Sequence, residues 1–453
     1  MKQFIWTLLL LLIASFGHAQ YSGGGKSNPG LLTNKESLQE FQDMRFGMFI
    51  HWGPVSLKGK EISWSRGREI PIEEYDKLYL DFNPELYAAA DWVGAAKAAG
   101  MQYIIITSRH HDGFSLWDSE FTDYDMASTP YGKGILKELA DECKKQGIKF
   151  GTYYSICDWY RDDYPVVYPA SDYGEHEPGN MDAATQVQME YYITFMKNQL
   201  KELIRDYNTF LIWFDGEWEW AWTHEMGTDM YAYLREMKDD ILINNRVDKG
   251  REGMEDKSRS ARFAGDFATP EQQIGAFDNK FAWETCMTIG EQWAWKPKEK
   301  LKSKKECIHT LLQTVGGDGN LLFNVGPMPD GRIEDRQVDI LKDIGRWLSL
   351  NQEAVYGTHG GPYLPTEKMV STHKENKIYL HLLDKPGSEL VLPLKEGIGI
   401  TSASFLQNST PLEVQRDKET LTLKLPEKLP DEVATVIELT LDRPASEIEL
   451  IKL

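Results

Sequence analysis

The sequence has no excess of basic residues, no cysteine-rich framework and no long hydrophobic segment. Its 453 residues include 50 Lys and Arg against 70 Asp and Glu, which gives a formal net charge of −20. Nucleic acids and anionic membranes attract basic surfaces, so this balance argues against both as partners. The four cysteines are too few and too scattered for a disulfide scaffold: Cys143, Cys157, Cys286 and Cys307. One disulfide would fit the sequence, which does not choose its pairing.

Motifs of several enzyme classes are also absent. No Gly-x-Gly-x-x-Gly follows the first predicted strand, which removes the commonest reason to expect a dinucleotide-binding fold. The Gly-x-Ser-x-Gly of many serine hydrolases is missing, as are the Cys-x-x-Cys and His-Glu-x-x-His spacings of zinc sites. The glycine-rich Gly316–Asn320 lacks the Lys-Ser/Thr of a phosphate-binding loop and precedes a strand, so it predicts a tight turn.

The apolar run at the N-terminus is too short for a membrane span. Lys2 precedes the apolar residues Ile5–Ala14, and Gly17-His18-Ala19 supplies small residues before a cleavage point. This pattern predicts a signal peptide at residues 1–19. No cysteine follows that run, which argues against a lipid anchor. We expect an exported protein without a membrane anchor, periplasmic or secreted, whose residues 20–35 are flexible.

From residue 36 to 355, short apolar strands alternate with amphipathic helices. Such strands are typical of a parallel sheet buried on both faces, and about eight of them favour a closed (β/α)8-type barrel. The predicted strands are Phe46–Ile50, Tyr103–Thr107, Lys149–Ser155, Phe210–Phe214, Ile241–Asn244, Phe263–Phe267, Phe281–Thr285 and Leu321–Val325. Helices are predicted before Gly100 and at Ile135–Lys145, Val187–Asp206, Met230–Met237, Lys304–Val315 and Arg336–Leu350.

Residues 356–453 have a different pattern. Helical periodicity disappears, and short β runs such as Ile378–Leu382 and Val436–Leu441 lie between turn signals such as Lys385-Pro386-Gly387. We therefore expect a second domain, an antiparallel β-sandwich that mainly supports the first.

Polar residues follow the predicted strands of the first domain, where the active sites of parallel barrels lie. The aromatic strand Phe210–Phe214 ends in Asp215, and Gly216 would let a ligand approach closely. A buried carboxylate is costly unless it is paired, so this position favours a catalytic role over a helix cap. With 14 Trp and 21 Tyr in the chain, a carbohydrate site is one candidate.

Hydrolysis of a glycoside needs two carboxyl groups. The candidates for the second are Glu271, Glu284 and Glu61, and chain position alone does not rank them. His51, His110 and His111 would suit hydrogen bonds to sugar hydroxyls, or alternatively a zinc ion that activates water. Adjacent residues on a strand point to opposite faces, so His110 and His111 can both serve only if the backbone turns there.

Four ordered motifs resemble glycoside hydrolase family 29, the retaining α-L-fucosidases. They are Phe46-Gly47-Met48-Phe49-Ile50-His51-Trp52-Gly53, Ser108-Arg109-His110-His111-Asp112-Gly113-Phe114, Trp213-x-Asp215, and Asn320-Leu321-Leu322-Phe323-Asn324-Val325-Gly326-Pro327. The resemblance covers about residues 36–357 and extends more loosely over the C-terminal β domain. It implies a barrel followed by a β-sandwich, and hydrolysis of terminal α-L-fucosides through a covalent intermediate.

The resemblance also assigns roles to individual residues. Asp215 would be the nucleophile, and the Asp-Phe-x-Thr-x-Glu pattern would make Glu271 the acid/base, with Glu284 as the alternative. The substrate-binding residues it implies are His51, Glu61, Trp64, His110, His111, Tyr154, Trp213, Arg246 and Trp293. It implies no metal and no organic cofactor, and a fucosylated glycan or oligosaccharide as the substrate.

Other functions compatible with the sequence are a glycosidase for a related sugar such as a galactoside, a non-catalytic carbohydrate-binding protein, and a zinc hydrolase. The sequence does not indicate an oligomeric state or a preferred linkage.

Overall fold

A computed structural model describes residues 31–166, 168–169, 179–249, 264–274, 277–395 and 398–453. The predicted signal peptide, residues 1–19, lies outside these ranges, and so does most of the segment 20–35. Within the described residues, no helix combines the length and the apolar character that crossing a membrane requires. All four cysteines are buried and free, so none of them forms a disulfide.

The first part of the chain is built on a parallel sheet of seven strands with the order β5-β4-β3-β2-β1-β7-β6. The strands are β1 (Phe46–Ile50), β2 (Tyr103–Arg109), β3 (Lys149–Ser155), β4 (Leu211–Asp215), β5 (Leu242–Ile243), β6 (Glu284–Thr288) and β7 (Asn320–Val325). Every side chain of β1, β2, β4 and β7 is buried, as expected for strands covered on both faces.

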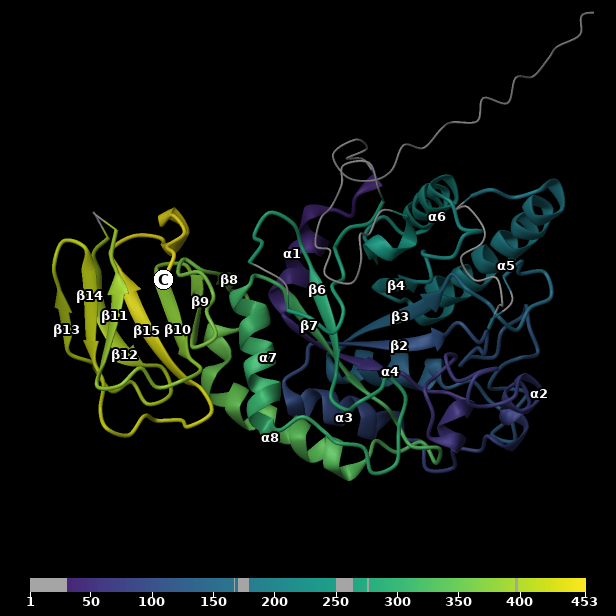
Figure 1. Ribbon diagram of the computed structural model, residues 1–453, viewed down its shortest axis with the longest axis horizontal. Helices are drawn as coiled ribbons and strands as arrows, with labels where there is room; N and C mark the ends of the chain where they lie inside the picture. Colours follow the sequence, from purple (N-terminus) through teal and green to yellow (C-terminus); the bar gives the residue numbers. More distant parts are fainter. Residues whose placement is uncertain (1–30, 167, 170–178, 250–263, 275–276, 396–397) are drawn as a thin grey trace, which may run out of the picture.

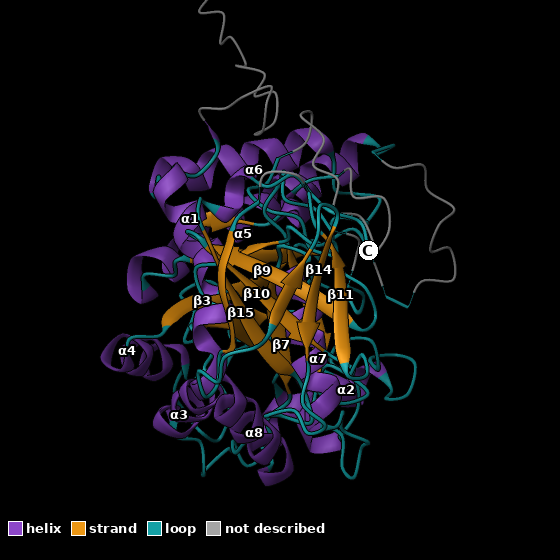
Figure 2. Ribbon diagram, turned by 90° about the vertical axis from the view of Figure 1, so that its left-hand side faces the viewer, coloured by secondary structure: helices purple, strands orange, loops and turns teal. Residues whose placement is uncertain are grey.

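Helices cover the outer face of this sheet (Figure 2). The longer ones are α1 (Lys35–Met44), α3 (Ala89–Ala99), α4 (Leu136–Gln146), α5 (Ala183–Tyr207), α6 (His224–Met237), α7 (Lys304–Gly316) and α8 (Asp335–Asn351), and α2 (Ile72–Tyr75) is a single turn. Their ends follow local signals: Gly100 and Gly147 take left-handed conformations after α3 and α4, and Ser303 with Glu306 forms a capping box at α7.

Among the described residues the sheet has seven regular strands, where the sequence predicts eight. The eighth strand was expected at Phe263–Phe267, of which the structure describes all residues but Phe263. Phe267 bridges to Asn244 after β5, and Ala268 bridges to Trp283 before β6, so single contacts connect the two edge strands. A regular strand is interrupted here by Gly265, with a φ of 122°, and by Pro270, which has no N–H to donate.

Two antiparallel sheets form the C-terminal part, a separate lobe beside α7 and α8 (Figure 1). One has the order β12-β15-β10-β9-β8 and the other β11-β14-β13. The strands are β8 (His359–Gly360), β9 (Met369–Lys374), β10 (Lys377–Leu382), β11 (Glu389–Pro393), β12 (Ile400–Phe405), β13 (Val414–Arg416), β14 (Thr420–Lys424) and β15 (Thr435–Leu441). Leu380 and Leu439 of one sheet share a core with Leu392 and Leu421 of the other, as in a sandwich.

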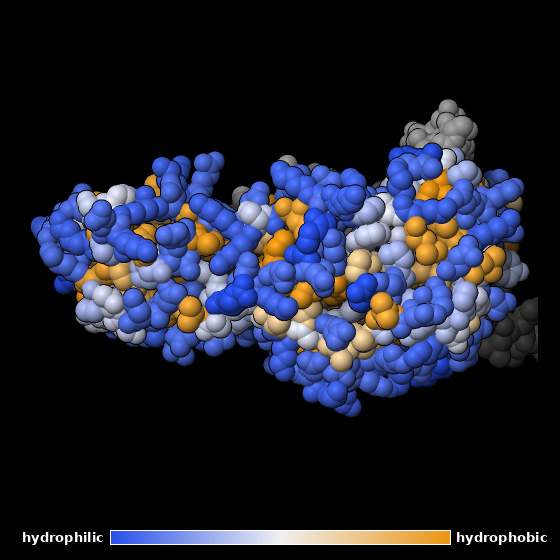
Figure 3. All heavy atoms as spheres, turned by 90° about the horizontal axis from the view of Figure 1, so that it is seen from below, coloured by the Kyte–Doolittle hydropathy of each residue, from blue (hydrophilic) through white to orange (hydrophobic). Residues whose placement is uncertain are grey.

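The lobe is attached to the helices rather than loosely linked. Val370 and Val436 belong to the same buried apolar cluster as the helices around the parallel sheet. The Trp347 indole donates to the Ala434 carbonyl at 2.9 Å, and the Arg45 guanidinium pairs with Asp318 at 2.7 Å beneath the sheet. The face in Figure 3 is mainly hydrophilic, with apolar residues in small separate patches.

Candidate active site

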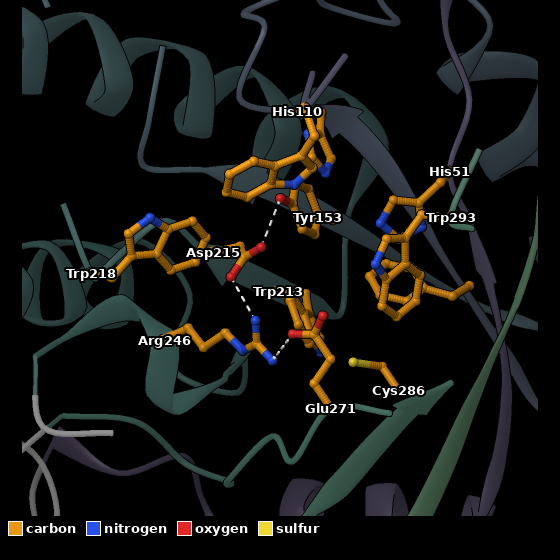
Figure 4. Close-up of a pocket in the computed structure, with 12 residues that line it drawn as sticks. His51, His110, Tyr153, Trp213, Asp215, Trp218, Arg246, Glu271, Cys286 and Trp293 are labelled. Atoms are coloured by element: carbon orange, nitrogen blue, oxygen red, sulfur yellow. Dashed lines mark hydrogen bonds and ion pairs between the residues drawn. The ribbon is translucent and has the colours of Figure 1, made fainter. Parts of the chain in front are cut away.

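A cavity of about 230 Å³ opens at the carboxyl ends of the parallel strands. It is smaller than the roughly 300–1,000 Å³ of most drug-sized sites, and its size suits one small ring. The residues that line it are Phe49, His51, Trp64, His110, Tyr153, Trp213, Asp215, Trp218, Arg246, Glu271, Cys286 and Trp293 (Figure 4). Eight of these were predicted from the sequence: His51, Trp64, His110, Trp213, Asp215, Arg246, Glu271 and Trp293.

Asp215 is the last residue of β4 and faces the cavity. Tyr153 donates from its hydroxyl to Asp215 Oδ2 at 3.2 Å, and Arg246 donates to Oδ1 at 2.7 Å. The backbone turns immediately afterwards at Gly216, whose φ is 102°. A Cβ at position 216 would lie 2.5 Å from Cys157 Sγ, so only glycine fits behind the carboxylate.

Arg246 connects the two candidate catalytic carboxyl groups. Nη1 binds Asp215, Nη2 binds Glu271 Oε2 at 2.8 Å, and Nε binds the Thr269 hydroxyl at 2.9 Å. Burial alone would lower the pKa of Arg246, but the charges of Asp215 and Glu271 outweigh that effect and raise it. The guanidinium is therefore a permanent cation placed between the two carboxyl groups.

The three histidines lie together and are held by neutral partners. Nδ1 of His51 contacts Asn324 at 2.6 Å, Nδ1 of His110 contacts the Ser63 hydroxyl at 2.7 Å, and Nδ1 of His111 contacts the Ser155 hydroxyl at 2.7 Å. Burial lowers the pKa of His51 to about 3 and that of His111 to about 4, and it also lowers the pKa of His110. At neutral pH these rings are uncharged hydrogen-bonding groups.

Both adjacent histidines reach the site because β2 ends at Arg109 and the chain turns at His111 and Asp112. His110 lines the cavity, while His111 Nε2 lies 3.7 Å from Asp215 Oδ2. In the part of the chain that is described, no three His, Cys, Asp or Glu side chains are arranged to hold a metal ion.

Glu61 was expected in the pocket but lies behind it. Its carboxylate accepts from the backbone N–H groups of Trp293 at 2.9 Å and Ala294 at 3.1 Å. The Trp293 carbonyl in turn accepts from Asn324 at 2.7 Å. Glu61 therefore fixes the loop that presents Trp293, and Trp64 is the residue of its segment that lines the cavity.

The expectation for Tyr154 was wrong by one residue. Tyr154 points to the helices, where its hydroxyl accepts from Arg109 at 3.0 Å and donates to Gln199 at 2.9 Å. Tyr153 lines the cavity instead, because successive side chains of a strand face opposite sides. In the register of the sheet Tyr153 pairs with Trp213, which also faces inward.

Replacing each tyrosine with phenylalanine should separate their roles. Tyr153→Phe removes a hydrogen bond to a charged carboxylate, worth about 1.5–3 kcal/mol, so we expect kcat/KM to fall about 10- to 100-fold. Tyr154→Phe should leave kcat/KM near the wild-type value and lower the free energy of unfolding by about 1–3 kcal/mol. Steady-state kinetics and urea unfolding of both variants check this, and the reverse pattern would contradict the assignment.

Glu284, the alternative acid/base, does not line the cavity. It begins β6 beneath the pocket and is fully buried. Trp213 Nε1 donates to Glu284 Oε1 at 3.1 Å, and the Tyr103 hydroxyl donates to Oε2. Burial raises the pKa of Glu284 to about 8 despite these two donors. The carboxyl group therefore holds a proton at neutral pH but lies away from a ligand in the cavity.

This raised pKa predicts a pH dependence of stability that Glu284→Gln should abolish. The folded protein keeps a proton that the unfolded chain releases above its ordinary pKa of 4.5. The contribution is complete below about pH 4.5 and is lost as the pH rises towards 8, at about 1.4 kcal/mol per pH unit. Urea unfolding at pH 5, 6, 7 and 8 should show wild type losing stability relative to Glu284→Gln, and parallel curves would contradict it.

Sequence reasoning missed four lining residues: Phe49, Tyr153, Trp218 and Cys286. The alternation of side chains along a strand could have identified Phe49, because it lies two positions before His51 and so faces the same side. Trp218 lies in a turn after β4, where no periodicity applies. Cys286 lies two residues after Glu284 on β6, a strand that was predicted three residues too early.

A parallel α/β sheet with paired carboxyl groups in a small aromatic cavity at the carboxyl ends of its strands is the arrangement of a glycoside hydrolase. The model of the α-L-fucosidase family matches residues 19–353, and the chain belongs to that family.

Curated and solved relatives agree with this membership. The chain is 28% identical to an α-L-fucosidase of Dictyostelium discoideum over 348 residues, which cover 70% of this chain and 71% of that protein. The structure of α-L-fucosidase isoenzyme 1 from Paenibacillus thiaminolyticus aligns with a TM-score of 0.77 at 32% identity, covering 90% and 99% of the two chains. A Bacteroides thetaiotaomicron α-L-fucosidase, solved as a trapped covalent intermediate, aligns with a TM-score of 0.82 at 26% identity, covering 93% and 99%.

Proposed function

We propose that this protein is a retaining exo-α-L-fucosidase in which Asp215 is the nucleophile and Glu271 the acid/base. One observation carries the assignment: adjacent nitrogens of the Arg246 guanidinium bind both carboxylates in the same cavity. Two acids held by one guanidinium are compatible with the roughly 5–5.5 Å of retaining enzymes, which is shorter than the separation in inverting enzymes. The covalent intermediate trapped in the Bacteroides relative supports the same stereochemistry.

The reaction would proceed in two displacements. Asp215 attacks the anomeric carbon and forms a bond to it, while the glycosidic bond breaks and Glu271 gives its proton to the departing oxygen. Glu271 then takes a proton from water, which attacks the same carbon and releases Asp215. Arg246 binds Glu271 through Oε2, so Oε1 is the oxygen that would face the leaving group.

Neutral donors and aromatic rings would bind the sugar. His51, His110 and His111 would present uncharged imidazoles to its hydroxyls, and Trp64 and Trp293 would contribute aromatic surface from two separate segments of the chain. The substrate would be a fucosylated glycan or oligosaccharide outside the cell, since the predicted signal peptide directs export. We also propose that residues 36–355 form one catalytic domain of the (β/α)8 type and residues 356–453 a supporting sandwich.

Hydrolysis of two substrates that differ by one hydroxyl tests the sugar specificity. We expect kcat/KM for 4-nitrophenyl α-L-fucoside to exceed that for 4-nitrophenyl α-L-galactoside by up to about 10²-fold, the discrimination that an apolar pocket achieves against an added hydroxyl. Asp215→Ala is the matched control and should abolish hydrolysis of both.

Three results would contradict the proposal. Faster hydrolysis of the galactoside would keep the mechanism and change the sugar. Loss of activity on treatment with a chelator would indicate a metal hydrolase. Tight binding of fucose without hydrolysis would indicate a carbohydrate-binding protein.

A further inference from the structure

The indole ring of Trp213 supports both groups that bind the Asp215 carboxylate. The Arg246 guanidinium carbon lies over this ring at 4.5 Å from its centre. The Tyr153 ring stacks on it with centroids 5.6 Å apart and an interplanar angle of 17°. Arg246 contacts one oxygen of Asp215 and Tyr153 contacts the other, as Figure 4 shows. A shift of the indole would therefore move both contacts.

The position of the Trp213 indole is fixed by a hydrogen bond to Glu284, on the side away from the cavity. Its Nε1 donates to Glu284 Oε1 at 3.1 Å, and the opposite oxygen of Glu284 accepts from Tyr103 at the start of β2. Trp213, Glu284 and Tyr103 are all buried, so these hydrogen bonds are not in competition with solvent. Because β2, β4 and β6 each supply one member, the three residues tie the sheet together beneath the cavity.

We propose that Glu284 is a positioning residue that fixes Trp213 by a hydrogen bond and, through the indole ring, sets Arg246 and Tyr153 against the nucleophile. The proposal rests on the function proposed above and adds a residue outside the cavity to the machinery of that site. Glu284 touches neither the substrate nor the reacting atoms, and it acts by its hydrogen bonds rather than by a negative charge.

Two substitutions separate the hydrogen bond from the charge. In Glu284→Gln the amide oxygen accepts from Trp213 and the amide nitrogen donates to Tyr103, so we expect kcat/KM within about 5-fold of wild type. Glu284→Met keeps the chain length but removes both acceptors, so we expect kcat/KM to fall about 10²-fold, the effect of misplacing reactive groups by about 1 Å. The acid limb of its pH profile should move to higher pH, because a displaced guanidinium favours the nucleophile carboxylate less.

A double-mutant cycle tests whether Glu284 acts through Trp213. Trp213→Phe removes the Nε1 donor, so adding Glu284→Met to it should lower kcat/KM by less than about 3-fold further. Leu341→Ala on α8 is the control for lost stability: it is buried far from the site and should lower the melting temperature without changing kcat/KM or the acid limb.

A measurement that does not depend on turnover uses the indole proton itself. In 15N-Trp-labelled protein, the Trp213 Nε1–H resonance, assigned with Trp213→Phe, should exchange slowly in wild type and Glu284→Gln. It should exchange at least about 10-fold faster in Glu284→Met. If wild type fails to hydrolyse the fucoside, the proposed function fails, and this exchange rate still decides whether Glu284 holds the indole.

Four results would overturn the positioning role: wild-type kinetics in Glu284→Met, an equal loss of activity with and without the Trp213 indole, a Glu284→Gln variant as slow as Glu284→Met, or unchanged indole exchange. Rescue of Glu284→Met by azide with formation of α-L-fucosyl azide would overturn it as well, because that product identifies an acid/base.

Discussion

Replacing Asp215 with alanine is expected to lower kcat for 4-nitrophenyl α-L-fucoside by about 10⁵-fold or more, the largest effect of any single substitution in this chain. No other described carboxylate in the cavity shares the contacts of Asp215 with Arg246 Nη1 and Tyr153. Without it the covalent intermediate cannot form, and water alone is a poor substitute nucleophile. Initial rates measured with the purified variant check this.

Azide identifies the missing group. The small anion can occupy the space of the absent carboxylate and attack the anomeric carbon directly, so the rescued product should be β-L-fucosyl azide, with inverted configuration. Asp318→Asn is the matched control, since Asp318 is also buried and paired with an arginine, Arg45, but lies beneath the sheet. It should lower stability and leave kcat unchanged. An active Asp215→Ala, or an azide product of retained configuration, would exclude Asp215 as the nucleophile.

Replacing Glu271 with alanine is expected to have an effect that depends on the leaving group. For a substrate with a sugar aglycone, which needs protonation to depart, kcat/KM should fall by about 10³- to 10⁴-fold. For 4-nitrophenyl α-L-fucoside, whose phenolate departs without help, kcat/KM should fall less than about 10-fold while kcat falls further, because release of the intermediate then becomes slow. Rates with both substrates, measured side by side, check this.

Azide should restore turnover of Glu271→Ala by attacking the intermediate from the side of the missing base. The product should then be α-L-fucosyl azide, of retained configuration. Glu291→Ala, which removes an exposed partner of Lys296, is the control and should behave as wild type. Equal losses on both substrates, or no rescue by azide, would assign the proton transfer to another residue.

The sequence predicted the strand and helix pattern and the position of Asp215 at the end of β4 well because the signals were strong there. The strand before Asp215 is a continuous apolar run, and a run of this kind must be buried on both faces, so its first polar residue lies at the active edge of the sheet. Helix ends could also be predicted where a glycine follows the last turn, as at Gly100 and Gly147. The predicted strands and helices from 46 to 351 agree with the structure within a few residues, apart from the irregular segment before β6 and the start of α6, six residues earlier than predicted.

Side-chain direction was harder to predict. Tyr153 and Tyr154 are the same residue type at adjacent positions, so hydrophobicity does not indicate which of them faces the cavity. The pairing of Tyr153 with Trp213 on the neighbouring strand decides it. Glu61 and Glu284 are both buried carboxyl groups near the site, but their partners are a loop backbone and an indole, far away in the sequence. Such contacts depend on the folded backbone and have no local signature.

The two proposed catalytic acids differ in how firmly the backbone fixes their place in the chain. Asp215 ends a strand that pairs with β3 through four residues. A residue inserted in β4 would shift this pairing by one position and move the side chains to the opposite face of the sheet. Glu271 lies on a segment joined to its neighbours by isolated bridges, with Gly265 and Pro270 close by. Changes of length are tolerated far better in such a segment. Over evolution, or in a designed library, we therefore expect the proposed proton donor to be the partner that can move to a new sequence position, while the proposed nucleophile stays in place.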